Sequence, residues 1–409
     1  MSTGMSRAAA AEVPFPMLGG VLDEPELAVL GEVLRSGDRL SQGQWRDRFE
    51  RAFADHVGAR HALTVTSGTV ALEMAVRLLD LQPGDEVIAT PQTFQATVHA
   101  LLGLPVTVRF CDIDANSLNI DVARMAELVT PRTRAVMLVH YGGLPAPMDE
   151  IMAITRPRGI VVVEDCAHAL GASYRGRRPG ALADIGCFSF HSSKTITTLG
   201  EGGMITFDRD DWAERVARIR GNDCDGVYRA ATARFDEVPK ALYPGLAHTH
   251  ECVTVRDPGT NATMGEPAAA VGLVQLGRLA ELSARRRHVA GVLDDHLRDR
   301  DDIRIQAVPP DVVHGRHLYT CFVEPGSGID RNALIRSLED LGVEMWLRYF
   351  PLHLLPEWRS RGHDFGECPT AERLWFGSQL NLPCHPALTD IHLERLVAAL
   401  DKALAGARA

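Results

Sequence analysis

Short apolar runs alternate with longer stretches of helical periodicity over residues 63–207. Such alternation is typical of successive β–α–β units that build a mostly parallel sheet. Residues 69–79 place apolar side chains at i, i+3, i+4, i+7 and i+8, which predicts a helix with one apolar stripe. Residues 85–89, 134–140 and 159–163 are β-branched runs that predict buried strands. We therefore expect the first half of the chain to be α/β.

The pattern changes in the second half. Residues 228–257 have no clear period, which predicts an irregular connection or a functional loop. Residues 264–297 predict one long helix, and β-like runs follow at 317–323 and 342–347 with a helix at 331–341 between them and a last helix at 389–404. The 409 residues are then expected to form a large α/β domain over 15–255 and a long connecting helix with a small α+β domain over 256–409.

Composition narrows the class of protein. A formal net charge of -10 gives no electrostatic reason to expect nucleic acid as a partner, and we expect Arg285, Arg286 and Arg287 to form a solvated helix face. The eight cysteines include no C-x-x-C pair, so they suggest neither a disulfide framework nor a zinc site, and a reducing cytoplasm is expected. Neither a signal peptide nor a membrane-spanning run is predicted.

One lysine, Lys194, lies in a turn rich in hydroxyl groups and glycine between two apolar runs. A lysine forms a Schiff base only as the neutral amine, so its site must lower the pKa by desolvation or by nearby positive charge. Ser189 and the later serines of this loop are natural phosphate ligands, and the glycines permit close backbone approach. The loop therefore suits Schiff-base chemistry beside a phosphate. The alternative is a surface lysine in an ordinary polar loop.

Asp165 follows the apolar run 160–163 and is expected at the mouth of a buried strand. A carboxylate there would keep the pyridine nitrogen of a pyridoxal cofactor protonated, which turns the ring into an electron sink. Glu164 would point to the opposite face of the strand, so only one of the two acids can do this. His168 is placed to form a hydrogen bond with the cofactor's phenolic oxygen. The alternative is an aspartate that caps a helix and a histidine satisfied within the core.

Ser67, Gly68 and Thr69 immediately precede the helix with the apolar stripe. Amides and hydroxyls at a helix N-terminus suit a phosphate, although many helices begin with an ordinary serine or threonine cap. Phe94 follows the strand at 85–89, where its ring could stack on a planar cofactor or simply join the core.

Together these segments resemble the fold-type I aminotransferases of the DegT/DnrJ/StrS group, which transfer an amino group to nucleotide-linked keto sugars or to cyclitols. The resemblance covers nearly the whole chain, and its motifs occur in the right order. They are Ser41-Gln42-Gly43 with Phe49-Glu50, Thr66-Ser67-Gly68-Thr69, Pro91-Gln92-Thr93-Phe94, Glu164-Asp165-Cys166-Ala167-His168, residues 189–203, residues 259–266, residues 349–353 and residues 382–386.

The resemblance implies a large domain with a mostly parallel, seven-stranded type of sheet flanked by helices, and a smaller C-terminal α+β domain. It implies pyridoxal 5′-phosphate as cofactor and Lys194 as the residue that forms the internal aldimine and then moves the proton. Asp165 would pair with the pyridine nitrogen, His168 with the phenolic oxygen, and Phe94 would stack on the ring. The residues implied at the phosphate are Ser67, Gly68, Thr69, Ser189 and Asn261.

Asn261 matches an asparagine that reaches the phosphate from the neighbouring subunit, which implies a homodimer with two shared sites. His317, Tyr349 and His353 match positions near the substrate entrance, although His317 could equally be a core or surface histidine. The expected reaction is a ping-pong transfer from L-glutamate or L-glutamine to a keto sugar or keto cyclitol, in amino sugar or antibiotic biosynthesis.

Two departures from the family pattern leave the acceptor open. Many members carry Arg-x-His-Gly where this chain has Arg218-Ile219-Arg220-Gly221, and many carry an aromatic-arginine pair where it has Ala262-Thr263. The alternatives are a keto-deoxy-sugar dehydratase of the same family and a regulatory relative without turnover. The dehydratases typically replace the lysine with histidine, so Lys194 argues against the first, and the presence of both Lys194 and Asp165 argues against the second.

Overall fold

The central sheet of the computed structural model is mostly parallel. The structure describes residues 11–15, 18–41, 43–221 and 257–407. The strands of this sheet are β1 (His61–Val65), β2 (Glu86–Ala89), β3 (Thr107–Phe110), β4 (Thr133–Val139), β5 (Val161–Asp165), β7 (Ile185–Ser189) and β8 (Gly203–Phe207). Their order is β1-β8-β7-β5-β4-β2-β3, and only β8 runs antiparallel to its neighbours. The predicted α/β class with a seven-stranded sheet is therefore confirmed.

Both faces of the sheet are buried, as a parallel sheet requires. In β4, for example, Ala135 and Met137 pack into one apolar cluster and Val136 and Leu138 into another.

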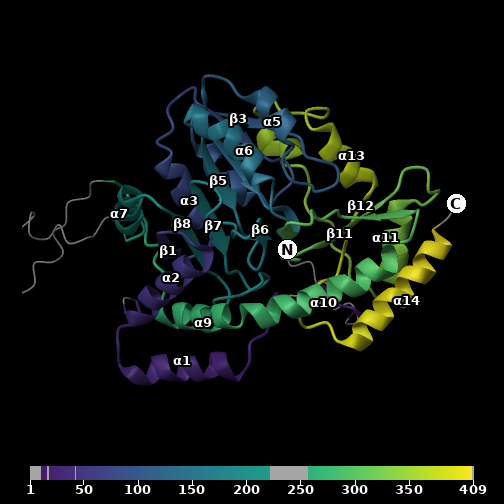
Figure 1. The fold of residues 1–409 in the computed structure, drawn as a ribbon, viewed down its shortest axis with the longest axis horizontal. Coiled ribbons are helices and arrows are strands. Elements are labelled where there is room, and N and C mark those ends of the chain that lie inside the picture. The colour runs from purple at the N-terminus through teal and green to yellow at the C-terminus, as the bar shows by residue number, and fades with distance from the viewer. Residues whose placement is uncertain (1–10, 16–17, 42, 222–256, 408–409) are drawn as a thin grey trace, which may run out of the picture.

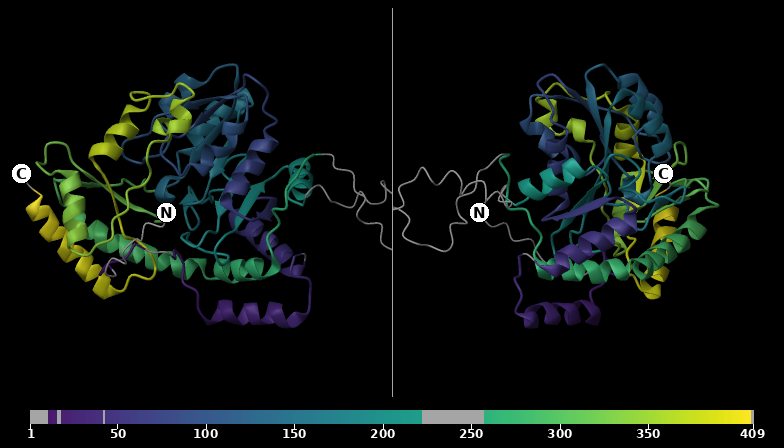
Figure 2. Two further views of the ribbon diagram at one scale, coloured as in Figure 1. Left: turned by 180° about the vertical axis from the view of Figure 1, so that it is seen from behind. Right: turned by 60° about the vertical axis from the view of Figure 1, so that its left-hand side comes forward.

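The helices around the sheet (Figure 1) are α1 (Glu24–Ser36), α2 (Gln44–Val57), α3 (Gly68–Leu78), α4 (Ala96–His99), α5 (Val122–Leu128), α6 (Met148–Thr155), α7 (Asp210–Ile219) and α9 (Glu266–Gly277), with short 3-10 turns η1 (Ala100–Gly103), η2 (Tyr141–Gly143) and η3 (Arg156–Arg158). α1 packs on α9, on the side away from the sheet (Figures 1 and 2).

A second, antiparallel sheet has the order β12-β11-β9. Its strands are β9 (Ile303–Ile305), β11 (Tyr319–Val323) and β12 (Gln379–Leu382), and the helices of this half are α10 (Leu279–Leu297), α11 (Arg331–Asp340), α12 (Pro356–Arg359), α13 (Pro369–Gly377) and α14 (Asp390–Gly406), with the turn η6 (Leu352–Leu354). α10, α11 and α14 share one apolar cluster with this sheet. A two-stranded pair, β6 (Ser173–Tyr174) with β10 (Val312–Val313), joins the two halves.

Three expectations of the sequence are corrected. The single long helix at 264–297 is two helices, α9 and α10, which break at Arg278, where the backbone turns to φ -92° and ψ 0° after Gly277. The run at 342–347 is no strand, because Gly342 ends α11 in a left-handed conformation and Val343 makes only a single bridge to Val13. Arg286 does not lie on a solvated face: it is 1% exposed.

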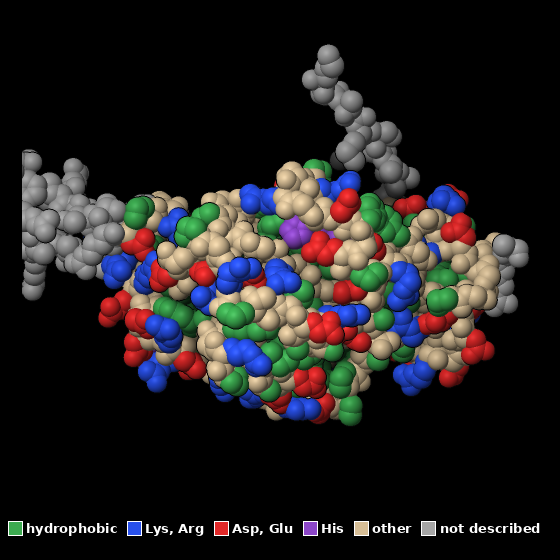
Figure 3. Space-filling view, turned by 90° about the horizontal axis from the view of Figure 1, so that it is seen from above, with side chains coloured by type: hydrophobic (Ala, Val, Ile, Leu, Met, Phe, Trp, Pro, Cys, Tyr) green, Lys and Arg blue, Asp and Glu red, His purple; other side chains and the backbone are tan. Residues whose placement is uncertain are grey.

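The predicted irregular connection at 228–257 and the predicted boundary between residues 255 and 256 fall in or at the edge of 222–256, outside the described residues, as do Gln42, Cys224 and Cys252. The division into two domains therefore stays a prediction. None of the helices within the described ranges is long and apolar enough to cross a membrane. Acidic and basic side chains are interspersed on the face shown in Figure 3, without a large patch of lysine and arginine among the described residues there.

Candidate functional site

Lys194 lies in the loop between β7 and β8. A hydrogen bond within the loop and another from the N-terminal segment hold this loop in place. The Lys194 amide donates to the carbonyl of His191 at 2.9 Å, and the Gly19 amide donates to the carbonyl of Ser192 at 2.8 Å. A Cβ atom on Gly19 would lie 2.1 Å from the Ser193 carbonyl oxygen, so only glycine lets the N-terminal segment pass this close. The backbone that carries the lysine is therefore held in one position.

The surroundings of the Lys194 amine favour its neutral form. The pKa of Lys194 is lowered to about 8: burial lowers it most, the Asp165 carboxylate raises it, and the Arg348 guanidinium lowers it. A neutral amine is the form that attacks a carbonyl or accepts a proton. Desolvation is therefore the main cause of the lowered pKa that Schiff-base chemistry requires of Lys194.

Asp165 ends β5 and is 4% exposed. The Thr97 hydroxyl donates to its Oδ2 at 2.7 Å, and the Ala167 amide donates to its Oδ1 at 3.0 Å. Burial raises the pKa of the Asp165 carboxyl, while both hydrogen bonds and the charge of Lys194 lower it. The structure thus places a buried acid, oriented by two donors, within electrostatic reach of the lysine.

Glu164 lies on the opposite side of β5, as strand alternation predicts. The amides of Leu182 and Ala183 donate to its Oε1 at 3.0 and 2.8 Å, and its Oε2 lies 2.8 Å from Nε2 of His140. Ligand atoms of His140, Glu164 and Cys166 lie within 4.8 Å of one another. Because hydrogen bonds already occupy the buried Glu164 and His140, this group holds the loop at 180–183 and does not form a reactive site.

His168 is the centre of an aromatic cluster. Its Nε2 lies 3.0 Å from the hydroxyl of Tyr349, and its ring stacks on His317 with centroids 4.5 Å apart. Burial lowers the pKa of both histidines well below the ordinary value, and Lys194 and Arg348 lower both further. Both rings are therefore neutral at physiological pH. Nδ1 of each ring is buried and has no hydrogen-bond partner among the described atoms, which leaves a polar atom for a ligand.

Phe94 is 51% exposed, so it does not belong to the core. Its ring meets Tyr349 edge-on at 6.3 Å. The Thr97 hydroxyl contacts both the Phe94 carbonyl, at 3.0 Å, and the Asp165 carboxylate. Thr97 therefore links the turn that carries Phe94 to the buried acid.

The N-terminus of α3 forms a cradle for an anion. Ser67 caps the helix, since its hydroxyl accepts a hydrogen bond from the Val70 amide at 3.2 Å, and the Gly68 and Thr69 amides precede the first intrahelical bond. A Cβ atom on Gly68 would lie 2.7 Å from Cβ of Ser189, so the turn approaches the end of β7 closely. Free amides beside a serine hydroxyl fit the phosphate of a pyridoxal cofactor.

Two of the predicted site residues are not brought to this cluster. Asn261 is exposed, and its backbone bridges Gly221 at the end of α7. His353 is fully buried, and its Nε2 contacts Oε1 of Glu372 at 2.9 Å. Within the described structure, His353 thus supports the interior around α13.

Two residues in or beside this cluster were not anticipated from the sequence. Thr97 carries no motif signal, because its contact with Asp165 joins α4 to the end of β5, 68 residues away in the chain. Arg348 directly precedes Tyr349 in a recognised motif, and its Nη1 lies 3.4 Å from the Tyr349 hydroxyl. Its place directly before that motif was the one signal that the sequence offered.

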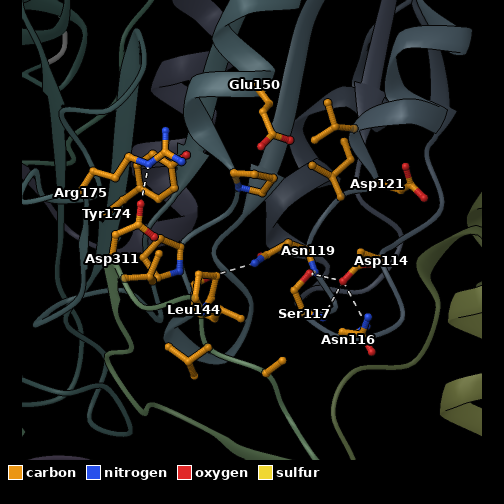
Figure 4. A pocket seen from close by; sticks show the side chains of 18 of the residues that line it. Asp114, Asn116, Ser117, Asn119, Asp121, Leu144, Glu150, Tyr174, Arg175 and Asp311 are labelled. Carbon is orange, nitrogen blue, oxygen red and sulfur yellow. Dashed lines mark hydrogen bonds and ion pairs between the residues drawn. The ribbon is translucent and has the colours of Figure 1, made fainter.

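A separate hollow of about 640 Å³ lies between the loop after β3 and the residues around β10 (Figure 4). Some of its polar groups are already paired: Arg175 with Asp311 at 2.7 Å, and the Asn119 side-chain amide with the Leu144 carbonyl at 3.0 Å. Lys194, Asp165 and His168 are not among the residues that line it. This hollow is therefore not the candidate site.

Comparison with known proteins agrees with this chemistry. A model of the DegT/DnrJ/EryC1/StrS aminotransferase family matches residues 21–401. The spore coat polysaccharide biosynthesis protein SpsC of Bacillus subtilis is 34% identical over 396 residues, 96% of this chain and 97% of SpsC. The GDP-perosamine synthase of Caulobacter vibrioides is 35% identical over 367 residues, 89% of this chain and 91% of that enzyme.

Solved structures show the same fold. An aminotransferase from Psychrobacter cryohalolentis superimposes with a TM-score of 0.85 at 27% identity, covering 97% of this chain and 100% of that one. DesV of S. venezuelae, solved in complex with a ketimine intermediate, superimposes with a TM-score of 0.79 at 29% identity. The match covers 92% of this chain and 94% of DesV. The chain is therefore a pyridoxal-phosphate-dependent aminotransferase that belongs to the DegT/DnrJ/EryC1/StrS family.

Proposed function

We propose that this enzyme transfers an amino group from L-glutamate or L-glutamine to a keto sugar, in its nucleotide-linked form, for amino sugar biosynthesis. The observation that carries the proposal is a lysine with a pKa lowered to about 8 beside a buried aspartate and a helix N-terminus fit for a phosphate. Relatives named for GDP-perosamine and for spore coat polysaccharide synthesis support a sugar acceptor. A keto cyclitol is the other acceptor class within the proposal. Antibiotic biosynthesis is the other pathway.

Pyridoxal 5′-phosphate, when bound, supplies the electron sink that stabilises a carbanion at the donor's α-carbon. Gly68, Thr69 and Ser189 would hold its phosphate, and Asp165 would keep the proton on the pyridine nitrogen. Phe94 would cover one side of the ring. These assignments fit the free amides of α3, the buried acid and the exposed aromatic ring.

Lys194 would accept the proton from the donor's α-carbon and deliver it to the cofactor, because its lowered pKa makes the neutral amine available. The neutral His168 and His317 would donate or accept hydrogen bonds without adding charge. His168, whose Nε2 lies 3.0 Å from the Tyr349 hydroxyl, would form the hydrogen bond to the phenolic oxygen of the cofactor.

Asn261 would serve the phosphate of a neighbouring subunit in a homodimer. Its exposed position, bridged to Gly221 after the end of α7, fits a residue that acts across an interface. His353 is not proposed as a substrate ligand, because Glu372 and the surrounding interior enclose it.

Borohydride trapping tests the cofactor assignment. The purified protein should absorb as a bound pyridoxal imine, and reduction should fix the cofactor on the peptide that contains Lys194. Lys194→Ala should lose the imine absorbance and half-transamination, whereas Lys402→Ala, at an exposed position of α14, should retain both. A colourless wild-type protein that takes up no cofactor would refute the proposal.

The acceptor is tested from the pyridoxamine form. Loading the enzyme with L-glutamate or L-glutamine and then adding candidate ketones should return the imine absorbance only with a productive acceptor. A nucleotide-linked keto sugar should react faster than a free keto cyclitol. The reverse order would move the assignment to cyclitols without affecting the aminotransferase chemistry.

A further inference from the structure

We propose that Tyr349 is a positioning residue that acts on the cofactor through His168. Its hydroxyl donates to Nε2 of His168 and thereby keeps the proton of this ring on Nδ1, from which it is donated to the phenolic oxygen of the cofactor. This inference rests on the proposed function and deepens it, because it assigns a role within the same cofactor site.

The hydrogen bond between Tyr349 and His168 has a defined direction. Nη1 of Arg348 lies 3.4 Å from the Tyr349 hydroxyl, and because a guanidinium can only donate, the hydroxyl oxygen accepts from it. Burial raises the pKa of Tyr349, so the hydroxyl keeps its proton at physiological pH. Within the described part of the chain, the partner of this hydroxyl that can accept is Nε2 of His168, at 3.0 Å. Tyr349 is therefore the donor and His168 the acceptor.

This direction decides which nitrogen of His168 carries the proton. Burial lowers the pKa of His168 well below its ordinary value, and three positive groups act in the same direction: Lys194, Arg348 and His140. The ring is therefore neutral at physiological pH and has a single N–H. Because Nε2 accepts from Tyr349, this N–H is on Nδ1.

Nδ1 of His168 is thus a donor without an acceptor. It is buried and has no hydrogen-bond partner among the described atoms, a condition that is rare for a buried N–H unless a ligand supplies the acceptor. The ring is also held in place: it stacks on His317 with planes 15° apart, and the ring of Tyr349 is nearly parallel to it, at 7°. The donor is therefore fixed before a ligand arrives.

The phenolic oxygen of pyridoxal 5′-phosphate is the acceptor that suits this donor. It is on the ring carbon next to the one that carries the aldehyde, and Lys194 would bind the cofactor through that aldehyde. The Lys194 charge acts on His168, so the histidine is within electrostatic reach of the amine. A hydrogen bond donated to an ionisable oxygen favours its ionised form. His168 should therefore lower the pKa of the bound cofactor as long as Tyr349 keeps the proton on Nδ1.

A pH titration of the absorbance of the bound cofactor, without substrates, tests the inference. Tyr349→Phe leaves Nε2 of His168 without its donor, so the ring proton can occupy either nitrogen and the bond to the phenolic oxygen weakens. The pKa of the bound cofactor should rise by about 0.5–1. The matched control is Tyr319→Phe, which removes another buried hydroxyl, in contact with Asp294 at 2.9 Å, and should leave this pKa unchanged.

His168→Gln separates an effect through the histidine from a direct one. The glutamine amide carries N–H donors that do not depend on a tautomer. In this background, Tyr349→Phe should therefore leave the pKa of the bound cofactor unchanged.

Nitrogen NMR of the histidine rings in the holoenzyme locates the proton independently of absorbance and activity. The His168 signals, assigned by their loss in His168→Gln, should show the proton on Nδ1 in the wild type. Tyr349→Phe should show a mixture of both tautomers.

Other outcomes overturn the assignment. A shift in Tyr349→Phe that persists in the His168→Gln background would mean that Tyr349 contacts the cofactor directly. An unchanged cofactor pKa in Tyr349→Phe, with a higher half-saturating concentration of donor or acceptor, would place Tyr349 at the substrate. A proton on Nε2 in the wild type would reverse the hydrogen bond. Each of these results refutes this inference alone, whereas a wild-type protein that takes up no cofactor refutes the proposed function.

Discussion

At the scale of single residues, the pKa of Lys194 predicts when the apoprotein can capture its cofactor. A lysine with the ordinary pKa of 10.5 would be almost fully protonated at pH 8, whereas a pKa of about 8 leaves half of the amine neutral there. The rate of imine formation with pyridoxal 5′-phosphate should therefore rise about tenfold per pH unit below this pKa and level off above it.

Stopped-flow absorbance of the apoprotein, followed from about pH 6 to about pH 10, gives this profile. Asp165→Asn should shift its midpoint to lower pH, because the Asp165 charge raises the pKa of Lys194. A midpoint that stays near 10.5 in the wild type would contradict the desolvated setting of the amine.

The sequence could predict those site residues whose role depends on strand and helix ends. Strand alternation alone separates Asp165 from Glu164, and the structure indeed turns them to opposite faces of β5. Thr97 and Arg348 could not be found this way, because Thr97 meets Asp165, and Tyr349 beside Arg348 meets His168, only through the packing of distant segments. Likewise, no local pattern distinguishes the buried His353 from a substrate histidine.

At the scale of secondary structure elements, the close approach of α3 to β7 predicts the effect of Gly68→Ala. The added Cβ atom would lie 2.7 Å from Cβ of Ser189, so the helix N-terminus must move away from the serine. Affinity for pyridoxal 5′-phosphate should fall by at least about tenfold, because the amides and the hydroxyl no longer converge on the phosphate.

Equilibrium titrations with pyridoxal 5′-phosphate and with pyridoxal, which lacks the phosphate, measure this effect. Pyridoxal binding should change little in Gly68→Ala. Gly291→Ala in α10, where an added Cβ atom meets nothing within 4 Å, should bind both ligands normally and stabilise its helix slightly. Equal weakening of both ligands would show that Gly68 serves the fold and not the phosphate.

The elements that the sequence predicts well are those with a clear period. The helix expected at 69–79 and the strand expected at 85–89 are found as α3 and β2, each within a residue. The N-terminal helices α1 and α2 were missed, although Asp23 and Glu26 form a capping box around Pro25 that marks the start of α1. Periodicity also continued across Arg278, so it gave no warning of the break between α9 and α10.

At the scale of the whole molecule, Arg286 connects parts that are distant in the chain. Its guanidinium donates to the carbonyls of Gly19 at 2.5 Å, Cys384 at 2.9 Å and Arg316 at 3.3 Å. Gly19 in turn lies on the loop that carries Lys194. A run of three arginines on a helix cannot reveal such a role, because it depends on a tertiary cavity of carbonyl groups.

Arg286→Met should therefore lower the free energy of unfolding by about 3–5 kcal/mol, since three buried carbonyls lose their donor. Arg287→Met, one position along on the exposed side of α10, should change it by less than about 0.5 kcal/mol. Chemical denaturation of the holoenzyme measures both. Equal stability of the two variants would mean that Arg286 contributes no net stabilisation and that the N-terminal segment is held by other contacts.

If the active site is shared between the subunits of a homodimer, a hybrid dimer of two inactive variants should regain activity. Lys194→Ala removes the lysine, and Asn261→Asp places a negative charge where the phosphate of the neighbouring subunit is expected. In a hybrid of the two, one site combines an intact Lys194 with an intact Asn261 from the other subunit, so activity should return to about half that of the wild type. Differently tagged subunits, co-expressed and purified through both tags, provide the hybrid for the half-transamination assay. If Asn261 serves the site of its own chain, neither site of the hybrid is complete and activity stays at the level of the separate variants.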